Sequence, residues 1–169
     1  MKCLLIGCGN SRTKRMALDG SDVWGELVTL DIDPSTGCDI VHDLDVLPYP
    51  LADNDFDEIH CYEVLEHVGR QGDWRGFFAQ FTELHRALKP GGHIFLSVPS
   101  PGSPWVWGDP GHTRALPEAA FHFLAQKHYA QVGKTSCTDY RPWWKGDLEI
   151  VGTQDENGSL CLALRKVPA

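Results

Sequence analysis

The strongest constraint on the fold is the segment of residues 2–6, apolar after Lys2, that runs directly into the turn Gly7-Cys8-Gly9. A continuously apolar run of this length is typical of a strand that is buried on both faces of a parallel sheet. Glycine lets the backbone approach a ligand closely, where a Cβ atom would block it. A second apolar segment, residues 27–30, ends at Asp31, whose carboxylate can accept hydrogen bonds from two ribose hydroxyls. The glycine turn and Asp31 together predict a pocket for a cofactor that carries adenosine.

The rest of the chain predicts an alternating order of strands and helices. Further strands are expected at residues 39–42, 56–62 and 93–98, and helices at residues 11–18, 74–88 and 117–131. Only a turn fits between Asp33 and Cys38, so one face of the sheet near this edge is expected to lack a covering helix. Residues 99–117 are rich in proline and glycine and predict a long loop beyond the end of a strand.

The C-terminal part predicts an antiparallel hairpin. Residues 147–153 and 160–165 are its strands, and Asn157-Gly158 belongs to its turn. The predicted fold class is therefore α/β, with a Rossmann-like, mostly parallel sheet, helices on its faces and a C-terminal antiparallel hairpin. One domain over residues 1–169 accounts for the whole chain.

Composition narrows the classes of partner. The net charge is −8 and the one basic cluster is short, residues 12–15, so a nucleic-acid backbone is an unlikely partner. No apolar run reaches the length of a membrane span, and we expect a cytoplasmic protein without membrane contact. The six cysteines form no C-x-x-C pair and predict reduced thiols. The eight histidines lack the spacing of a zinc site, so no metal is predicted.

Four sequence blocks resemble the class I S-adenosylmethionine-dependent methyltransferases, in their order and over nearly the whole chain. The blocks are residues 5–9 (Leu-Ile-Gly-Cys-Gly), 30–34 (Leu-Asp-Ile-Asp-Pro), 42–48 (His-Asp-Leu-Asp-Val-Leu-Pro), and 56–67 with the later turn at 88–92. Two positions depart from the family pattern: Leu5 replaces an acidic residue, and Asn10-Ser11 replaces a later glycine. The resemblance implies S-adenosyl-L-methionine as cofactor and a small-molecule or protein side chain as methyl acceptor.

The resemblance also implies a set of cofactor-binding residues. Asp31 would hold the ribose and Asp43 the adenine amino group, while backbone around Tyr62 and Glu63 would bind the methionine ammonium. The full set that it assigns to the cofactor is Gly7, Cys8, Gly9, Asp31, Ile32, Asp43, Leu44, Tyr62 and Glu63.

Two histidines are candidate catalytic bases, because a base is needed only where the acceptor carries a proton. His112 lies in the predicted loop, near Arg114, which could bind an anionic group of the acceptor. His67 follows the strand at 56–62. For each histidine a structural role, His112 bonded to backbone and His67 at a helix start, remains open.

Two other functions remain open from the sequence. An NAD-dependent oxidoreductase would need a third glycine near position 12, where Arg12 stands. A noncatalytic cofactor-binding or assembly protein would explain Leu5 and an exposed sheet face or edge, through which the chain could form a homo-oligomer.

Overall fold

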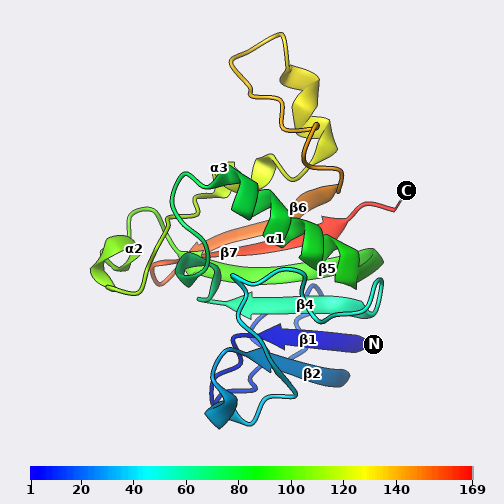
Figure 1. Cartoon of the computed structure of the whole chain (residues 1–169), viewed down its shortest axis with the longest axis vertical. Coiled ribbons are helices and arrows are strands. Elements are labelled where there is room, and N and C mark those ends of the chain that lie inside the picture. The colour runs from blue at the N-terminus through cyan, green and yellow to red at the C-terminus, as the bar shows by residue number, and fades with distance from the viewer. Residues whose placement is uncertain (169) are drawn as a thin grey trace.

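Strands β3-β2-β1-β4-β5-β7-β6 form, in that order, one sheet in the computed structural model, which describes residues 1–168 (Figure 1). Five of them are parallel: β1 (Lys2–Ile6), β2 (Glu26–Asp31), β3 (Ile40–Val41), β4 (Phe56–Tyr62) and β5 (Leu88–Pro99). The hairpin of β6 (Leu148–Glu156) and β7 (Ser159–Lys166) adds antiparallel to β5. The predicted fold class is confirmed.

Helix α1 (Trp74–Ala87) covers one face of the sheet. The side chain of Asp73 caps it by accepting from the backbone N–H of Gly76 at 2.9 Å, as Asp at this position predicts. Its buried residues Phe81 and Leu84 belong to the same core cluster as Ile59 of β4 and the alternate residues of β5. The aromatic stripe of α1 is therefore core packing.

The predicted helix at residues 11–18 is wrong, because this segment is irregular. The hydroxyl oxygen of Tyr62 accepts from the backbone N–H groups of Arg15 and Met16, at 3.3 and 3.2 Å. An α-helix over this segment would need both donors for its own ladder. The irregular segment packs against the sheet face opposite α1, where Met16 and Trp24 contact the small buried cluster of Leu5, Cys8 and Tyr62.

The predicted helix at residues 117–131 is also wrong in its extent. It is divided into α3 (Glu118–His122) and the 3₁₀ helix η3 (Gln126–Gln131). The carbonyl of Leu124, which a continuous helix would use internally, accepts from the indole of Trp144 and the backbone N–H of Leu148, both at 2.9 Å. Long-range partners thus replace the helical ladder at this point.

The loop predicted at residues 99–117 lies beyond the carboxyl ends of β4 and β5, at the left of Figure 1. It contains one short helix, α2 (Trp105–Gly108). The connection from β2 to β3 holds only the 3₁₀ turn η1 (Pro34–Thr36), as the spacing predicts. No helix among residues 1–168 is both long and apolar enough to cross a membrane.

Candidate functional site

The glycine turn and Asp31 meet at the carboxyl edge of the sheet. Gly7 and Gly9 have positive φ values of 63° and 46°, which glycine adopts without strain. The backbone N–H of Gly9 donates to Oδ2 of Asp31 at 2.8 Å, and that of Asp33 donates to Oδ1 at 3.0 Å. Each carboxylate oxygen keeps a second lone pair, so Asp31 is held in place and can still accept from a ribose.

Gly7 is also required by the strand beside it. A Cβ atom at position 7 would overlap the side chain of Val64, just after β4. The absence of a side chain at Gly7 therefore lets the ends of β1 and β4 come close together. This places the Asp31 region next to the residues that follow β4.

The other predicted cofactor residues have different surroundings. Ile32 is 63% exposed beside Asp31, whereas Leu44 is almost fully buried in the main core. Asp43 is exposed, and its Oδ1 accepts from the N–H of Asp45 at 2.9 Å. The side chains of Cys8 and Tyr62 are buried in the small cluster on the sheet face opposite α1, so only their backbone is available to a cofactor.

The chain turns sharply after β4. Glu63 has a φ of 54°, an unusual value for a residue with a Cβ atom, which costs about 1–3 kcal/mol. The 3₁₀ helix η2 (Leu65–His67) follows. The turn brings the Glu63 side chain close enough to Glu66 for its charge to act on the Glu66 carboxyl group. Strain of this kind at the carboxyl edge is typical of functional sites.

Glu66 is 1% exposed, yet neither of its carboxylate oxygens has a hydrogen-bond partner among residues 1–168. Oε1 of Glu63 is buried and unpartnered in the same described part of the chain. An unpaired buried polar group costs about 1–3 kcal/mol. Burial, together with the charge of Glu63, raises the pKa of Glu66 to about 8. Two facing carboxylates without donors indicate a place for a ligand.

The two predicted catalytic histidines meet at this place. The rings of His67 and His112 are 4.6 Å apart between centroids, and Nε2 of His112 lies 4.0 Å from Oε1 of Glu66. Nδ1 of His67 lies 3.1 Å from the carbonyl oxygen of Gly111, and Nδ1 of His112 lies 3.3 Å from that of Val106. A carbonyl only accepts, so both Nδ1 atoms donate, and in the neutral imidazole the lone pair lies on Nε2.

A cavity of about 320 Å³ lies beneath the loop at residues 99–117, and it is lined by Glu63, Glu66, His67 and His112. Trp105 and Asp109 of this loop line the same cavity, as do Asn157 and Gly158 of the hairpin turn. The loop thus covers the end of β4, and the cavity is the open space nearest to the unpaired carboxylates.

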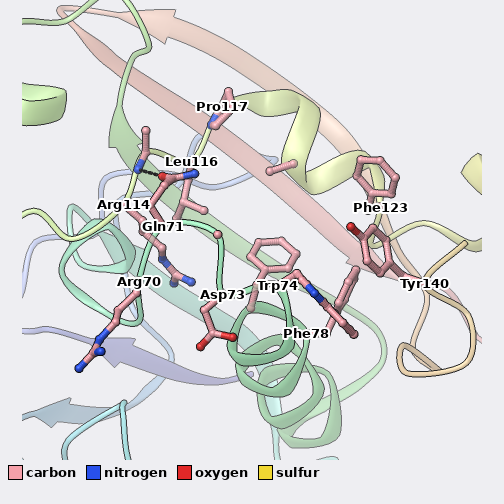
Figure 2. A pocket seen from close by; sticks show the side chains of 14 residues that line it. Arg70, Gln71, Asp73, Trp74, Phe78, Arg114, Leu116, Pro117, Phe123 and Tyr140 are labelled. Carbon is pink, nitrogen blue, oxygen red and sulfur yellow. Dashed lines mark hydrogen bonds between the residues drawn. The ribbon is translucent and has the colours of Figure 1, made fainter. Parts of the chain in front are cut away.

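Arg114 serves the site indirectly. Its side chain is buried, and it donates to the carbonyl of Leu65 at 2.8 Å and to Oε1 of Gln80 at 2.8 Å. The sequence suggested that Arg114 could bind an anionic group of the acceptor. In the structure its guanidinium instead holds the first residue of η2. Arg114 also lines a separate pocket of about 360 Å³ beside the N-terminus of α1, with Trp74, Phe78 and Tyr140 (Figure 2).

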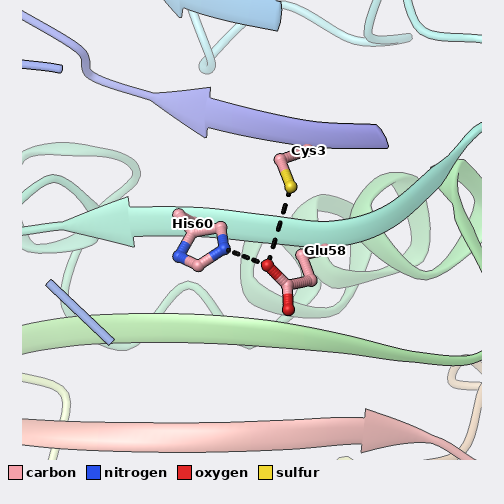
Figure 3. Close-up of side chains that lie close together, drawn as sticks. All are labelled: Cys3, Glu58 and His60. Atoms are coloured by element: carbon pink, nitrogen blue, oxygen red, sulfur yellow. Dashed lines mark hydrogen bonds and ion pairs between the residues drawn. The ribbon is translucent and has the colours of Figure 1, made fainter. Parts of the chain in front are cut away.

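A second glutamate–histidine cluster lies on β4 itself, on the sheet face opposite α1 (Figure 3). Oε2 of Glu58 lies 3.0 Å from both Nζ of Lys14 and Nε2 of His60, and 3.6 Å from the thiol of Cys3. Nδ1 of His60 lies 2.6 Å from the Tyr62 hydroxyl, and burial lowers the pKa of His60 to about 4. The carboxylate of Glu58 thus has an internal cation, and the cluster holds residues 11–24 against the sheet.

Comparison with known proteins agrees with this geometry. The profile of the family described as "Methyltransferase domain" matches residues 4–96, more than half of the chain. The fold and the match define the class I S-adenosylmethionine-dependent methyltransferase family as the class of this chain. Within that class, the chain belongs to the methyltransferase-domain family, whose cofactor is the S-adenosylmethionine expected from the sequence. No curated protein sequence matches the chain.

Solved structures share the fold at low sequence identity. A methyltransferase from Archaeoglobus fulgidus has a TM-score of 0.58 at 14% identity, over 98% of this chain and 86% of that one. A putative methyltransferase of Haloferax volcanii, in complex with the Trm112 methyltransferase activator, has a TM-score of 0.60 at 16% identity, over 99% of this chain and 83% of that one. An S-adenosylmethionine-dependent methyltransferase from Mesorhizobium loti has a TM-score of 0.59 at 17% identity, over 98% of this chain and 90% of that one.

Glu66 is the residue that sequence reasoning missed. The sequence shows Glu66-His67 as adjacent with no third ligand nearby, whereas the fold brings Glu63 and His112 to them. No local pattern marks Glu66, because His112 reaches it only through the loop at residues 99–117.

Proposed function

We propose that the chain transfers the methyl group of S-adenosylmethionine to a small molecule or a protein side chain bound beneath the loop at residues 99–117. The observation that carries this proposal is the arrangement at the carboxyl edge. A preorganised Asp31 lies at the end of β2, and Gly7 directly follows β1. Beyond β4 lie Glu63 and Glu66, whose buried carboxylate oxygens (Oε1 of Glu63, both of Glu66) have no partner among residues 1–168. In open α/β sheets, ligands bind at this edge.

Each predicted cofactor residue has a role that fits its position. Asp31 accepts from the ribose hydroxyls, Asp43 accepts from the adenine amino group, and exposed Ile32 contacts the ring, with Leu44 supporting this region from the core. The backbone of Gly7, Cys8 and Gly9 approaches the methionine portion, and the backbone at Tyr62 and Glu63 binds its ammonium.

The bound sulfonium supplies an already activated methyl group. The acceptor's lone pair forms the new bond to carbon, the S–CH₃ bond breaks, and its electron pair stays on sulfur. The chain's own residues align the acceptor and exclude water, which is the function that we assign to the loop with Trp105. His67 and His112 are the candidates to take a proton from a hydroxyl or amine acceptor.

The alternative is a noncatalytic cofactor-binding or assembly protein of the cytoplasm. Leu5 at a position that is acidic in the family and the helix-free segment at residues 11–24 support this alternative. A second copy of the chain could then pair with an exposed sheet edge at β3 or β6, or cover the face opposite α1. A homo-oligomer that persists on dilution in light scattering would favour it.

Calorimetry with S-adenosylhomocysteine, S-adenosylmethionine and NAD⁺ tests the proposal. We expect saturable binding of the first two ligands and none of NAD⁺. A panel of hydroxyl, amine and protein acceptors with radiolabelled S-adenosylmethionine then tests transfer. Binding without transfer to any acceptor class would support the assembly alternative, and binding of NAD⁺ alone would contradict both.

A further inference from the structure

The cavity beneath the loop at residues 99–117 brings together two carboxyl groups and two imidazoles. Glu66, His67 and His112 each place one ligating atom within 4.8 Å of the others, and Glu63 lines the same cavity. Both carboxylate oxygens of Glu66 and Oε1 of Glu63 are buried without a donor in the described chain. Two neighbouring carboxylates repel one another unless a proton or another positive charge lies between them.

The histidines are oriented as metal ligands usually are. Each has Nδ1 on a backbone carbonyl, Gly111 for His67 and Val106 for His112, so the lone pair of the neutral ring lies on Nε2. Such an outer hydrogen bond fixes the tautomer and orientation of a ligating imidazole. Nε2 of His112 faces Oε1 of Glu66 at 4.0 Å, which leaves room for an ion between the two atoms.

Among residues 1–168, no lysine or arginine fills this role. Arg114, whose charge acts on Glu66, gives hydrogen bonds to Leu65 and Gln80 and none to either glutamate. In the Glu58 cluster on the other face of β4, by contrast, Lys14 supplies the cation.

We infer that Glu63, Glu66, His67 and His112 form a binding site for one divalent cation. Two carboxylates and two imidazoles are a mixed oxygen and nitrogen donor set, which suits Mn²⁺, Fe²⁺ or Zn²⁺. The cavity extends beyond these side chains to Trp105 and Ser103, so the cation has open positions for an acceptor oxygen.

The role of the cation rests on the proposed methyl transfer. A hydroxyl of the acceptor that binds the cation becomes more acidic and is held in place. Its proton passes to water, its oxygen forms the bond to the methyl carbon, and the S–CH₃ electron pair remains on sulfur. His67 and His112 then give lone pairs to the cation instead of accepting the proton.

Calorimetric titration of the whole chain with MnCl₂, after dialysis against a chelator, tests the inference. We expect one Mn²⁺ per chain, with affinity at least about tenfold lower in Glu66→Gln and His112→Gln. Glu118 and His122 are the matched control, because this exposed pair has a similar separation of 3.8 Å. Glu118→Gln and His122→Gln should leave Mn²⁺ affinity unchanged.

Absence of saturable Mn²⁺ binding by the wild-type chain up to about 1 mM would overturn the inference. Binding that Glu66→Gln and His112→Gln leave unchanged would overturn it too. A chain that binds methylammonium but not Mn²⁺ would show a site for an amine instead. S-adenosylhomocysteine titrated in parallel separates the two proposals, since its failure to bind alongside normal Mn²⁺ binding would contradict only the methyltransferase function.

Discussion

Strand β4 carries two clusters of glutamate and histidine that differ in one respect. Around Glu58 and His60, each polar group has a partner, and Lys14 brings the positive charge. Around Glu66, beyond the end of the same strand, the carboxylate oxygens have no partner among residues 1–168. The same residue types therefore make a structural network where the chain supplies the cation and a ligand site where it does not.

The largest expected effect concerns the paired cluster. Glu58→Gln removes the carboxylate that neutralises buried Lys14, so the free energy of unfolding should fall by about 3–5 kcal/mol. Urea denaturation followed by circular dichroism measures this change. Glu118→Gln, at an exposed position, is the control and should change stability by less than about 0.5 kcal/mol. An equal effect of both substitutions would remove the distinction between the clusters.

Mild acid should lower the free energy of unfolding through His60 of the same cluster. Burial holds the pKa of His60 at about 4, below its ordinary 6.5, so the unfolded chain takes up this proton first. Stability is then lost as the pH falls from 6.5 toward 4, by about 2 kcal/mol between pH 7 and pH 5. His60→Gln should remove this share of the pH dependence in urea titrations, whereas His122→Gln should keep it; His85, whose pKa burial also lowers to about 4, contributes equally in both variants. Parallel pH profiles for wild type and His60→Gln would show that His60 is not buried as a neutral ring.

In the cluster around Glu66, loss of a carboxylate should raise the free energy of unfolding instead of lowering it. In chelated protein, Glu66→Gln replaces a buried carboxylate that lacks donors by a neutral amide that can donate to Glu63. The free energy of unfolding should rise by about 1–2 kcal/mol. A fall comparable to that of Glu58→Gln would mean that Glu66 has a partner within the chain, and would break the comparison.

The smallest effect concerns the backbone at Glu63. Glu63→Asn keeps the φ of 54° with a residue that tolerates it better and removes one carboxylate. We expect a stability gain of about 0.5 kcal/mol and weaker Mn²⁺ binding. Thermal unfolding with and without MnCl₂ checks both, and a matched gain in Mn²⁺ affinity would contradict the role given to Glu63.

Local patterns predicted most of the fold. The strands follow from apolar runs, α1 follows from its cap at Asp73 and its apolar stripe, and the hairpin follows from Asn157-Gly158. The helix at residues 11–18 failed because Tyr62, far along the chain, takes the N–H groups of Arg15 and Met16. Local propensity does not contain such a partner.

The candidate site was predictable only where single strands end in it. Asp31 follows from the second strand and the glycine turn. The cluster at Glu66 depends on the loop that brings His112 back over η2, and on the burial of two carboxylates in one place. Neither feature has a local sequence signature, so His67 and His112 appeared as separate candidate bases.

The most direct test of the account is the affinity of S-adenosylhomocysteine for the wild-type chain and for Asp31→Ala, measured by calorimetry. We predict one site per wild-type chain and an affinity at least about tenfold lower in Asp31→Ala, with the fold retained. Asp33→Ala, two residues away, should keep the affinity, because the Asp33 side chain only caps the turn η1. Unchanged affinity in Asp31→Ala, or no binding by the wild-type chain, would contradict the account.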